Sequence, residues 1–371
     1  METRTVTIGD ASPDDEQIRE AGAALARGEL IVFPTETVYG LGASALGREA
    51  IDAMNRLKNR QPGKPFTLHL PDPEQARTYA GTLSPVALRL IRRAWPGPLT
   101  LVLPDRRENP GRPEGLFEAA IYHRGTVGLR CPDHAVGRAI LRAAGVPVVG
   151  TSANLAGQPP PRTAPDALAQ LDGRVPLVVD AGPARHAGPS TVVRVQADDS
   201  YQVLREGAVS DRRLARLART CLLFVCTGNM CRSPMAVGLA RKILADRLDC
   251  TSDDLDAHGF EITSAGTACA WGGPASDNAI RVMAERGIDL ARHRSRPMTV
   301  DALAQADYIW VMTGGHREAA IRHAPAVAAK VSLVDPAGRE VSDPIGGNLE
   351  VYRTCARHLE QALAHRLAEV V

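Results

Sequence analysis

Residues 226–234 read Cys-Thr-Gly-Asn-Met-Cys-Arg-Ser-Pro, and this stretch decides how the second half of the chain folds. It follows the apolar run 222–225 and precedes a helical pattern, so the sequence predicts a strand, a loop and a helix in that order. A loop in this position directs its backbone N–H groups and the positive end of the helix toward one point. We therefore expect an anion to bind there, with Cys226 at the mouth of the loop.

The residue types in this loop indicate that the anion is a phosphoryl group. Positive charge and a helix N-terminus favour the thiolate form of a cysteine, so Cys226 is the candidate nucleophile. Arg232 can offer its planar guanidinium to two phosphate oxygens, and the Ser233 hydroxyl can donate to the thiolate. Gly228 and Asn229 tolerate the left-handed backbone that a tight loop needs. The alternative is that the two cysteines of this loop, Cys226 and Cys231, only pack against their neighbours. The spacing Cys-x5-Arg-Ser favours a catalytic role instead.

This stretch resembles the low-molecular-weight protein tyrosine phosphatases and their relatives, the protein-arginine phosphatases, which carry Cys-x5-Arg-Ser followed by Pro. The resemblance implies that Cys226 and Arg232 are catalytic and that Asp343, in an Asp-Pro pair late in the domain, is the general acid. Asp335, in a second Asp-Pro pair, is the reserve acid. The phosphate loop would consist of Thr227, Gly228, Asn229, Met230, Cys231 and Ser233. We expect no cofactor for this reaction.

Short apolar runs alternate with helical patterns in this part of the chain. Strands are expected at residues 222–225, 261–264, 308–312 and 331–334, and helices from residues 235, 276, 317 and 349. The pattern predicts an α/β fold with a doubly wound, four-stranded parallel sheet. The phosphate-binding loop then lies at the carboxyl end of the first strand.

The choice between phosphotyrosine and phosphoarginine is open in the sequence. The tyrosine-specific enzymes carry an aliphatic residue at the position of Met230, and Trp271 could stack on a substrate ring and wall the pocket. In contrast, the segment 345–347, Ile-Gly-Gly, lacks an aromatic pair and resembles the arginine-specific pattern. We expect phosphotyrosine, with phosphoarginine as the alternative. Cys231 is expected either to form a reversible disulfide with Cys226 or to pack as a free thiol.

Length and composition limit the remaining possibilities. At 371 residues the chain is long enough for two domains. Lys and Arg number 44 against 42 Asp and Glu, so net charge gives no case for binding nucleic acid or a membrane. Seven cysteines without Cys-x2-Cys spacing argue against a disulfide framework or a structural metal site. Residues 1–17 lack an apolar segment and no run approaches membrane-spanning length, so we expect a cytoplasmic protein.

Helical and extended patterns also alternate in the first part of the chain. Helices are expected at residues 15–28, 48–57, 85–95 and 135–144, and strands at 30–33, 66–70, 99–103, 127–131 and 147–150. Residues 34–42 read as a polar loop bounded by glycine, and residues 104–125 as an exposed loop or lid. The alternation predicts a twisted mixed or parallel sheet covered by helices.

Three motifs in this part occur in a recognisable order: Pro-Thr-Glu-Thr-Val-Tyr-Gly-Leu-Gly at 34–42, Lys-x-Arg at 58–60 and Ser-x-Asn at 152–154. Together they resemble the threonylcarbamoyl-AMP synthase (YrdC-like) family over about residues 21–210. The resemblance implies that L-threonine, bicarbonate and ATP are joined to give threonylcarbamoyl-AMP and pyrophosphate. The threonylcarbamoyl-AMP then supplies the threonylcarbamoyladenosine modification of tRNA. The residues expected to bind ATP and threonine are Thr35, Thr37, Lys58, Arg60, Lys64, His69, Arg130, Ser152, Asn154, Ser190 and Arg194.

The residue types fit that chemistry, because joining two anions requires a pocket that holds several cations and excludes water. Mg²⁺ is expected with ATP, although the sequence contains no evident carboxylate cage. For Lys58 and Arg60 the simpler alternative is a favourable charge pair at a helix C-terminus. For His69 a place in the core and a place in the pocket wall are equally expected.

We expect three segments: a synthase domain at 1–207, a linker at 208–220 and a phosphatase domain at 221–371. The arginine-rich linker could contact tRNA, but a solvated charged face is the simpler reading. Expected partners are the tRNA-modification machinery and a phosphoprotein substrate. One alternative is a tRNA- or double-stranded-RNA-binding protein with a non-catalytic, phosphate-sensing second domain. A carbamoyl-transfer maturation factor is disfavoured because its Cys-x2-Cys repeats are missing.

Overall fold

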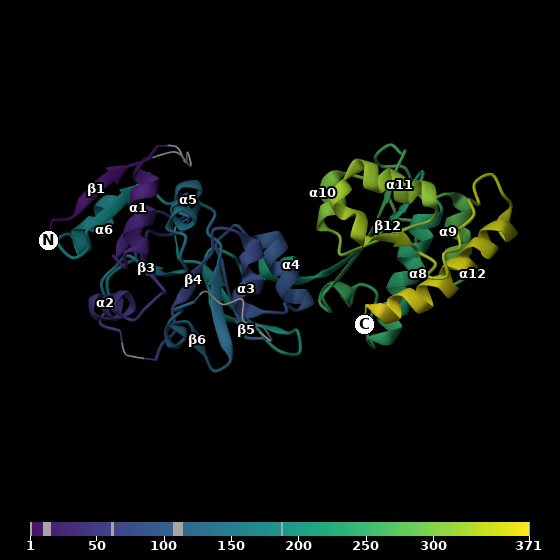
Figure 1. Cartoon of the computed structure of the whole chain (residues 1–371). Coiled ribbons are helices and arrows are strands. Elements are labelled where there is room, and N and C mark those ends of the chain that lie inside the picture. Colours follow the sequence, from purple (N-terminus) through teal and green to yellow (C-terminus); the bar gives the residue numbers. More distant parts are fainter. Residues whose placement is uncertain (1, 10–15, 61–62, 107–113, 187, 371) are drawn as a thin grey trace. The chain divides into compact units, whose positions relative to one another are not determined.

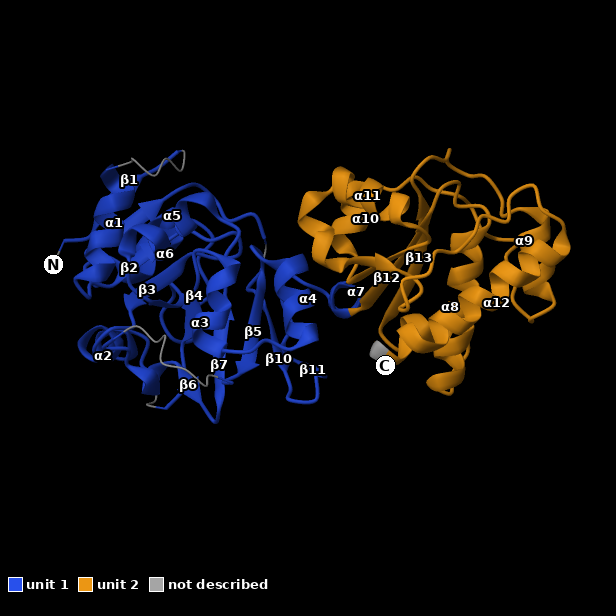
Figure 2. Cartoon of the chain, turned by 45° about the vertical axis from the view of Figure 1, so that its right-hand side comes forward, with its two compact units in different colours: residues 1–218 blue, residues 219–371 orange. Residues whose placement is uncertain are grey.

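The chain folds into two compact units, Met1–Ala218 and Arg219–Val371, which Figure 2 shows in different colours. The structure is a computed structural model that describes residues 2–9, 16–60, 63–106, 114–186 and 188–370. Each unit is built on its own sheet, so the α/β fold predicted for both parts of the chain is confirmed. In the described part of the chain, no helix is both long and apolar enough to cross a membrane.

The first unit contains one mixed sheet of eleven strands (Figure 1). Its order is β1-β9-β2-β3-β8-β4-β7-β5-β10-β11, with β6 paired to β7. The strands are β1 (Arg4–Thr7), β2 (Ile31–Phe33), β3 (Gly40–Ser44), β4 (Thr67–His69), β5 (Leu99–Pro104), β6 (Tyr122–His123), β7 (Thr126–Arg130), β8 (Val148–Ser152), β9 (Leu177–Asp180), β10 (Thr191–Val195) and β11 (Tyr201–Arg205). The sequence predicted β2, β4, β5, β7 and β8, and it missed β1, β3, β6 and the strands after β8.

Helices cover both faces of this sheet, which explains why β2 is apolar at every position. Ile31 and Phe33 enter a core with α1 and α5, whereas Val32 points into the larger core on the other face. Successive side chains of a strand alternate between faces, so a strand with two covered faces has no polar positions. The helices are α1 (Glu16–Ala26), α2 (Glu49–Leu57), α3 (Ala76–Ala80), α4 (Pro85–Ala94), α5 (Ala135–Ala144), α6 (Ala164–Leu171) and α7 (Asp211–Ala218), with short 3-10 turns at Pro73–Gln75 and Glu118–Ala120.

The segment 34–42, expected to be a polar loop, differs from that expectation. Residues 30–45 are all buried, and β3 begins within the segment at Gly40, antiparallel to β2. A Cβ added at Gly40 or Gly42 would lie 3.0 or 3.1 Å from the Phe33 ring, so the glycines make room for that ring. Their small size therefore reflects close packing of two strands. In the expected lid at 104–125, residues 107–113 lie outside the described residues, and the remainder includes β6.

The second unit is a parallel four-stranded sheet in the order β13-β12-β14-β15, as predicted. Along β12, Leu222, Phe224 and Cys226 face the core under α8, α9 and α12, while Leu223 and Val225 face the core under α10 and α11. Its strands are β12 (Thr220–Cys226), β13 (Phe260–Gly266), β14 (Tyr308–Val311) and β15 (Val331–Leu333). Its helices are α8 (Arg232–Arg247), α9 (Asp277–Ala284), α10 (Val300–Gln305), α11 (Gly314–His323) and α12 (Leu349–Arg366), with 3-10 turns at Asp254–Asp256, Pro325–Lys330 and Leu367–Glu369. Of these helices the sequence analysis missed α10.

The expected linker at 208–220 is mostly part of the first unit. Leu214 is fully buried in the core of that unit, and α7 packs on α4. Arg89 Nε donates to Ala218 O at 2.7 Å and Arg93 Nη1 donates to Leu217 O at 2.9 Å. These arginines satisfy carbonyls at the C-terminal end of α7, which would otherwise lack partners. The division between the units therefore falls after Ala218.

We predict that Leu214→Ala destabilises the first unit. Removing this buried side chain leaves a cavity and should lower the free energy of unfolding by about 2–5 kcal/mol. Urea denaturation of the full chain measures the loss, and hydrogen exchange of the α4 and α7 amides assigns it to the first unit. Arg212→Ala, on the exposed face of α7, is the matched control and should change stability by less than about 0.5 kcal/mol. If the two variants behave alike, α7 is a linker.

Two candidate active sites

The loop between β12 and α8 is held in a tight turn by the buried side chain of Asn229. This residue has a left-handed backbone, with φ of 51°. Its amide Nδ2 donates to Ser233 Oγ and to Ser264 Oγ, both at 2.8 Å. Its Oδ1 accepts the backbone N–H of Arg296 at 2.9 Å. The three contacts fix the loop to its own helix, to β13 and to the segment before α10.

Cys226 lies at the end of β12, and its Sγ is 3.0 Å from Ser233 Oγ. Ser233 Oγ already accepts a hydrogen bond from Asn229, so its own proton is free to point at the sulfur. A hydroxyl that donates to sulfur stabilises a thiolate more than a thiol. The geometry therefore suits Cys226 as a nucleophile and as a leaving group.

Arg232 and Asp343 meet at this loop, although 111 positions separate them in the chain. Arg232 is 5% exposed, and its Nη2 forms an ion pair with Asp343 Oδ2. Its Nη1 donates to Val341 O at 3.2 Å, and its buried Nε has no hydrogen-bond partner within the described residues. The Asp343 side chain is 41% exposed, so an incoming substrate can reach it. The two side chains that the sequence analysis placed in one site are thus brought together.

A histidine that the sequence analysis missed lies against the same loop. His316 Nε2 is 2.9 Å from Thr227 Oγ1, and His316 Nδ1 is 2.8 Å from Thr313 Oγ1. Thr227 Oγ1 also accepts from Arg232 Nη2 at 3.3 Å. Burial, together with the positive charge of Arg232, lowers the pKa of His316 and keeps the ring neutral. His316 and Asp343 therefore both help to orient Arg232: His316 acts through Thr227, and Asp343 contacts the same guanidinium nitrogen directly.

The position of His316 could have been inferred from the order of elements. It follows β14 by five residues, at the start of α11, and the carboxyl ends of parallel strands share one edge of a sheet. In the sequence, the residues around 317 show only the pattern of a helix start.

Three large apolar side chains are exposed on segments that contact the loop. Trp271 is 71% exposed, and Met230 and Ile345 are also exposed. The segment carrying Trp271 is hydrogen-bonded to the loop through its residues 267 and 268, and Ile345 follows Asp343 by two positions. Trp271 is thus an exposed side chain on a segment that is hydrogen-bonded to the loop.

The remaining two candidates of this unit have local structural partners. Cys231 is buried, with Sγ 3.3 Å from Ser276 Oγ and 3.4 Å from Tyr352 Oη, and it is a free thiol. Asp335, the reserve acid, is also buried and accepts from His358 Nε2 at 2.7 Å and Arg339 Nε at 2.8 Å. Burial raises the pKa of Asp335, but the hydrogen bonds, that from His358 foremost, outweigh burial and lower it. Asp335 thus joins its turn to α12 as a carboxylate.

The first unit contains a pocket of about 300 Å³ at the ends of β3, β4, β8 and β10. Seven of the residues predicted to bind ATP and threonine are in or directly behind it. Thr35, Arg60, His69, Arg130, Ser152 and Ser190 line the pocket, and Thr37 lies behind Arg130. Two predicted residues differ: Lys64 lines a neighbouring pocket, and Arg194 is exposed on β10 and lines neither. Arg194 is on the face of β10 opposite the core residues Val193 and Val195.

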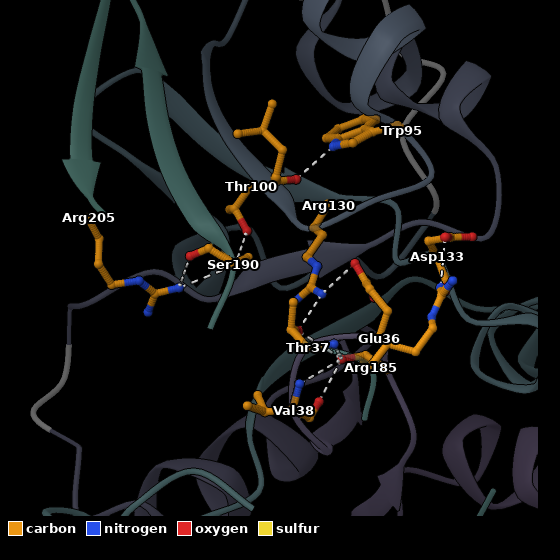
Figure 3. Close-up of polar contacts among 12 residues, drawn as sticks. Glu36, Thr37, Val38, Trp95, Thr100, Arg130, Asp133, Arg185, Ser190 and Arg205 are labelled. Carbon is orange, nitrogen blue, oxygen red and sulfur yellow. Dashed lines mark hydrogen bonds and ion pairs between the residues drawn. The ribbon is translucent and has the colours of Figure 1, made fainter. Parts of the chain in front are cut away.

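Arg130 is held from below by two buried residues of segment 34–42 (Figure 3). Its Nη2 donates to Thr37 Oγ1 at 2.6 Å and lies 3.0 Å from Glu36 Oε1. Glu36 is fully buried and was missed by the sequence analysis. Thr35 Oγ1 lies 3.0 Å from Thr37 Oγ1, so the same cluster orients a hydroxyl at the pocket.

Lys58 anchors the loop that contains Ser152 and Asn154. Its Nζ donates to Ser152 O at 2.8 Å, to Asn154 O, and to Asn154 Oδ1 at 3.3 Å. Burial, and then the nearby charge of Arg60, lowers the pKa of Lys58 to about 8. The ammonium thus holds the loop in place, and a direct contact between Lys58 and phosphate stays a prediction.

Other groups give the pocket a positive, water-poor wall. Arg205, which the sequence analysis missed, donates to Ser190 O at 2.8 Å and to Ser190 Oγ at 3.2 Å (Figure 3). Burial lowers the pKa of Arg60, whose guanidinium lies 4.3 Å above the Phe66 ring. Burial, and then Arg130, lowers the pKa of His69 to about 3, so this ring is neutral. The pocket can therefore bind anions through Arg60, Arg130 and Arg205. No group of three His, Cys, Asp or Glu suited to a metal ion occurs within the described ranges.

Two family models match the two parts of the chain separately. The family described as "Telomere recombination" (Sua5_yciO_yrdC) matches residues 23–207, and the family described as "Low molecular weight phosphotyrosine protein phosphatase" matches residues 221–371. The chain is 37% identical over 205 residues to the threonylcarbamoyl-AMP synthase of Bacillus subtilis (strain 168), covering 55% of this chain and 57% of the relative. The chain thus spans little more than half the length of that relative.

Two further matches cover nearly all of the other protein. A putative threonylcarbamoyl-AMP synthase of Mycobacterium tuberculosis (strain H37Rv) is 35% identical over 215 residues, covering 58% of this chain and 95% of that protein. The solved YwlE arginine phosphatase from Geobacillus stearothermophilus is 32% identical, covering 41% of this chain and 92% of that chain, with a TM-score of 0.36.

We predict that Thr227→Val lowers kcat/KM for p-nitrophenyl phosphate about tenfold, because a buried partner of Arg232 and His316 is lost. Thr227→Ser, which keeps the hydroxyl, should stay within about twofold of the parent protein. Steady-state kinetics measure the difference, and the melting temperatures of both variants separate it from unfolding. Equal activity of the Val and Ser variants would contradict the role assigned to the His316–Thr227–Arg232 chain.

Proposed function

Since the chain belongs to the Sua5/YrdC family over residues 23–207 and carries a low-molecular-weight phosphotyrosine phosphatase domain over residues 221–371, we propose that it is a bifunctional enzyme. The first unit makes threonylcarbamoyl-AMP for the threonylcarbamoyladenosine modification of tRNA. The second unit hydrolyses phosphotyrosine in proteins by cysteine-dependent catalysis. The observation that carries the second activity is the meeting of Cys226, Arg232 and Asp343 at one loop.

In the proposed synthesis, the carboxylate of N-carboxy-threonine, formed from L-threonine and bicarbonate, attacks the α-phosphorus of ATP. The bond to the β-phosphate oxygen breaks, and pyrophosphate leaves. Arg60 and Arg130 bind the two anions and offset their repulsion, and the Thr35 hydroxyl orients the threonine. Lys58 holds the loop of Ser152 and Asn154 against the nucleotide.

Mg²⁺ is proposed to accompany ATP and to neutralise charge on its phosphates. The described residues offer no cluster of three ligands, so phosphate oxygens and water would provide most of its coordination. We further propose a cytoplasmic protein that passes its adenylate product to the tRNA-modification machinery.

In the proposed hydrolysis, the Cys226 thiolate attacks the phosphorus while Arg232 binds two equatorial oxygens. Asp343 protonates the leaving oxygen, and a phosphocysteine forms. Water then attacks the phosphorus, Asp343 takes its proton, and the S–P bond breaks to release phosphate and the thiolate. Ser233 stabilises the thiolate in both steps.

Phosphotyrosine is proposed as the substrate because Met230 provides an apolar contact and the exposed Trp271 can stack on a phenyl ring. The second candidate is phosphoarginine, which the Ile345-Gly346-Gly347 segment favours because it supplies no aromatic wall after Asp343. The Cys226–Cys231 disulfide remains a proposal, and both thiols are free in the structure.

A tRNA- or double-stranded-RNA-binding protein is the alternative from another class. The exposed arginines at 212, 213 and 216 of α7 would provide its contact. A protein of that class would release no pyrophosphate with ATP and threonine and would not hydrolyse aryl phosphates.

We predict that the two activities can be lost one at a time. Cys226→Ser should lower p-nitrophenyl phosphate hydrolysis by about 10³-fold or more, since the nucleophile is removed, and should leave pyrophosphate release intact. Lys58→Ala should lower threonine-dependent pyrophosphate release by about tenfold or more, because the loop of Ser152 and Asn154 loses the half-buried ammonium that holds it, and should leave hydrolysis intact. Loss of both activities in either variant would refute independent sites.

We also predict a preference for phosphotyrosine when phosphotyrosine and phosphoarginine peptides of one sequence are compared side by side. Met230→Thr should reduce the ratio of the two kcat/KM values about tenfold, because an apolar contact to the ring is replaced by a hydroxyl. Phosphate release measures both rates. A parent protein that prefers phosphoarginine would reverse the assignment of substrate.

A further inference from the structure

A second pocket in unit 2, of about 810 Å³, lies between α8 and the segment 287–296. β13 and Trp271 complete its wall, and the catalytic residues Cys226, Arg232 and Asp343 do not line it. Its basic lining residues are Arg241, Lys242, Arg292, His293, Arg294 and Arg296. Asp253 and Asp289 are the acidic ones, and neither forms an ion pair with a pocket cation in the part of the chain that the structure describes.

The positive charge in this pocket is only partly compensated by the two carboxylates. Arg241 and Arg292 have no hydrogen bond or ion pair among the described residues. Lys242 Nζ donates to a backbone carbonyl at 2.9 Å, and Arg296 Nε donates to another, Ser264 O, at 2.7 Å. A carbonyl fixes the position of a cation without neutralising it. Five cations therefore face two carboxylates across one concave surface.

The pKa of His293 is affected by the positive charges of this pocket. Burial is the largest cause that lowers its pKa; the hydrogen bond to Asn229 raises it, and the charges of Arg296 and Arg294 lower it. A group that is disfavoured as a cation by two neighbouring arginines lies in a region that attracts anions.

The pocket wall is bonded to the phosphate loop through Asn229. His293 Nε2 donates to Asn229 O at 2.7 Å, and the backbone N–H of Arg296 donates to Asn229 Oδ1 at 2.9 Å. Asn229 in turn positions Ser233, which contacts the sulfur of Cys226. Two hydrogen bonds therefore connect a ligand-binding residue of this wall to Ser233: one from the wall to Asn229 and one from Asn229 to Ser233.

We propose that this pocket binds an oligophosphate, either pyrophosphate or the phosphate chain of a nucleotide, and that its occupancy weakens substrate binding at the phosphate loop. Guanidinium groups match phosphate oxygens in pairs, and the volume exceeds that of a single phosphate. The bound anion cancels part of the positive field that attracts the phosphorylated substrate. The proposed binding depends only on the charges of the pocket. The proposed effect on turnover also rests on the proposed phosphatase function.

Binding is tested on the full chain with pyrophosphate, ATP and AMP as probes. Isothermal titration gives the affinities, and hydrogen exchange locates the protected peptides. Pyrophosphate and ATP should protect peptides that span residues 238–253 and 286–296, and AMP should bind more weakly because it carries one phosphate. If ATP protects these peptides and pyrophosphate does not, the bound anion is the phosphate chain of a nucleotide. No protection of these peptides by any probe would overturn the proposal.

Arg241→Ala/Arg292→Ala should weaken pyrophosphate binding at this pocket about tenfold or more. The matched control, Arg212→Ala/Arg213→Ala on α7, removes two exposed charges elsewhere and should leave these peptides protected. Arg241→Lys/Arg292→Lys keeps the charge and should retain part of the affinity. Unchanged binding in the Ala double variant would overturn the site.

Turnover separates this pocket from competition at the phosphate loop. Saturating pyrophosphate should raise KM for p-nitrophenyl phosphate about twofold or more in the parent and in the α7 control. The Ala double variant should be insensitive. Inhibition that persists in the double variant would place the anion in the loop and overturn the coupling. If the chain hydrolyses no aryl phosphate, the phosphatase function fails, and the hydrogen-exchange result still decides the binding site.

Discussion

The buried amide of Asn229 is the constraint on which the second unit depends. One side chain in a left-handed backbone joins the phosphate loop to α8 through Ser233 and to β13 through Ser264. Because every polar atom of that amide is buried, an unmade contact would cost the full desolvation of the group. The loop is therefore fixed before any ligand arrives. A preorganised cradle is what stabilisation of a transferring phosphoryl group requires.

In the first unit, charged side chains near the pocket are held in place by groups from other segments. Arg130 has to face a pocket while its guanidinium is nearly inaccessible to water, and Glu36 and Thr37 supply the partners that make this placement stable. Lys58, which is half-buried, is likewise held by carbonyl oxygens of the loop that it organises. In both units, then, cations near the sites are oriented by groups from distant segments.

The sequence was informative wherever a strand ends at a functional loop. The alternation of apolar and helical segments predicted all four strands of the second unit, because the strands are rich in buried apolar side chains and the central strands, β12 and β14, contribute to the cores on both faces. It failed where packing rather than pattern decides: residues 34–42 look polar yet are buried, since glycines at 40 and 42 admit the Phe33 ring. The arginine-rich helix α7 looks like a linker, yet Leu214 attaches it to the first core.

By itself the sequence determined the two families, the two sheets and the chemistry-bearing residues Cys226 and Arg232, because these depend on local spacing around a strand, a loop and a helix. The family resemblance also named Asp343, but only the tertiary structure decided how the remote groups meet, and it added His316 to the site. Asp343 meets Arg232 across 111 positions, and His316 reaches Thr227 across 89. Such pairings depend on the shared edge where parallel strands end, and no local periodicity encodes that edge.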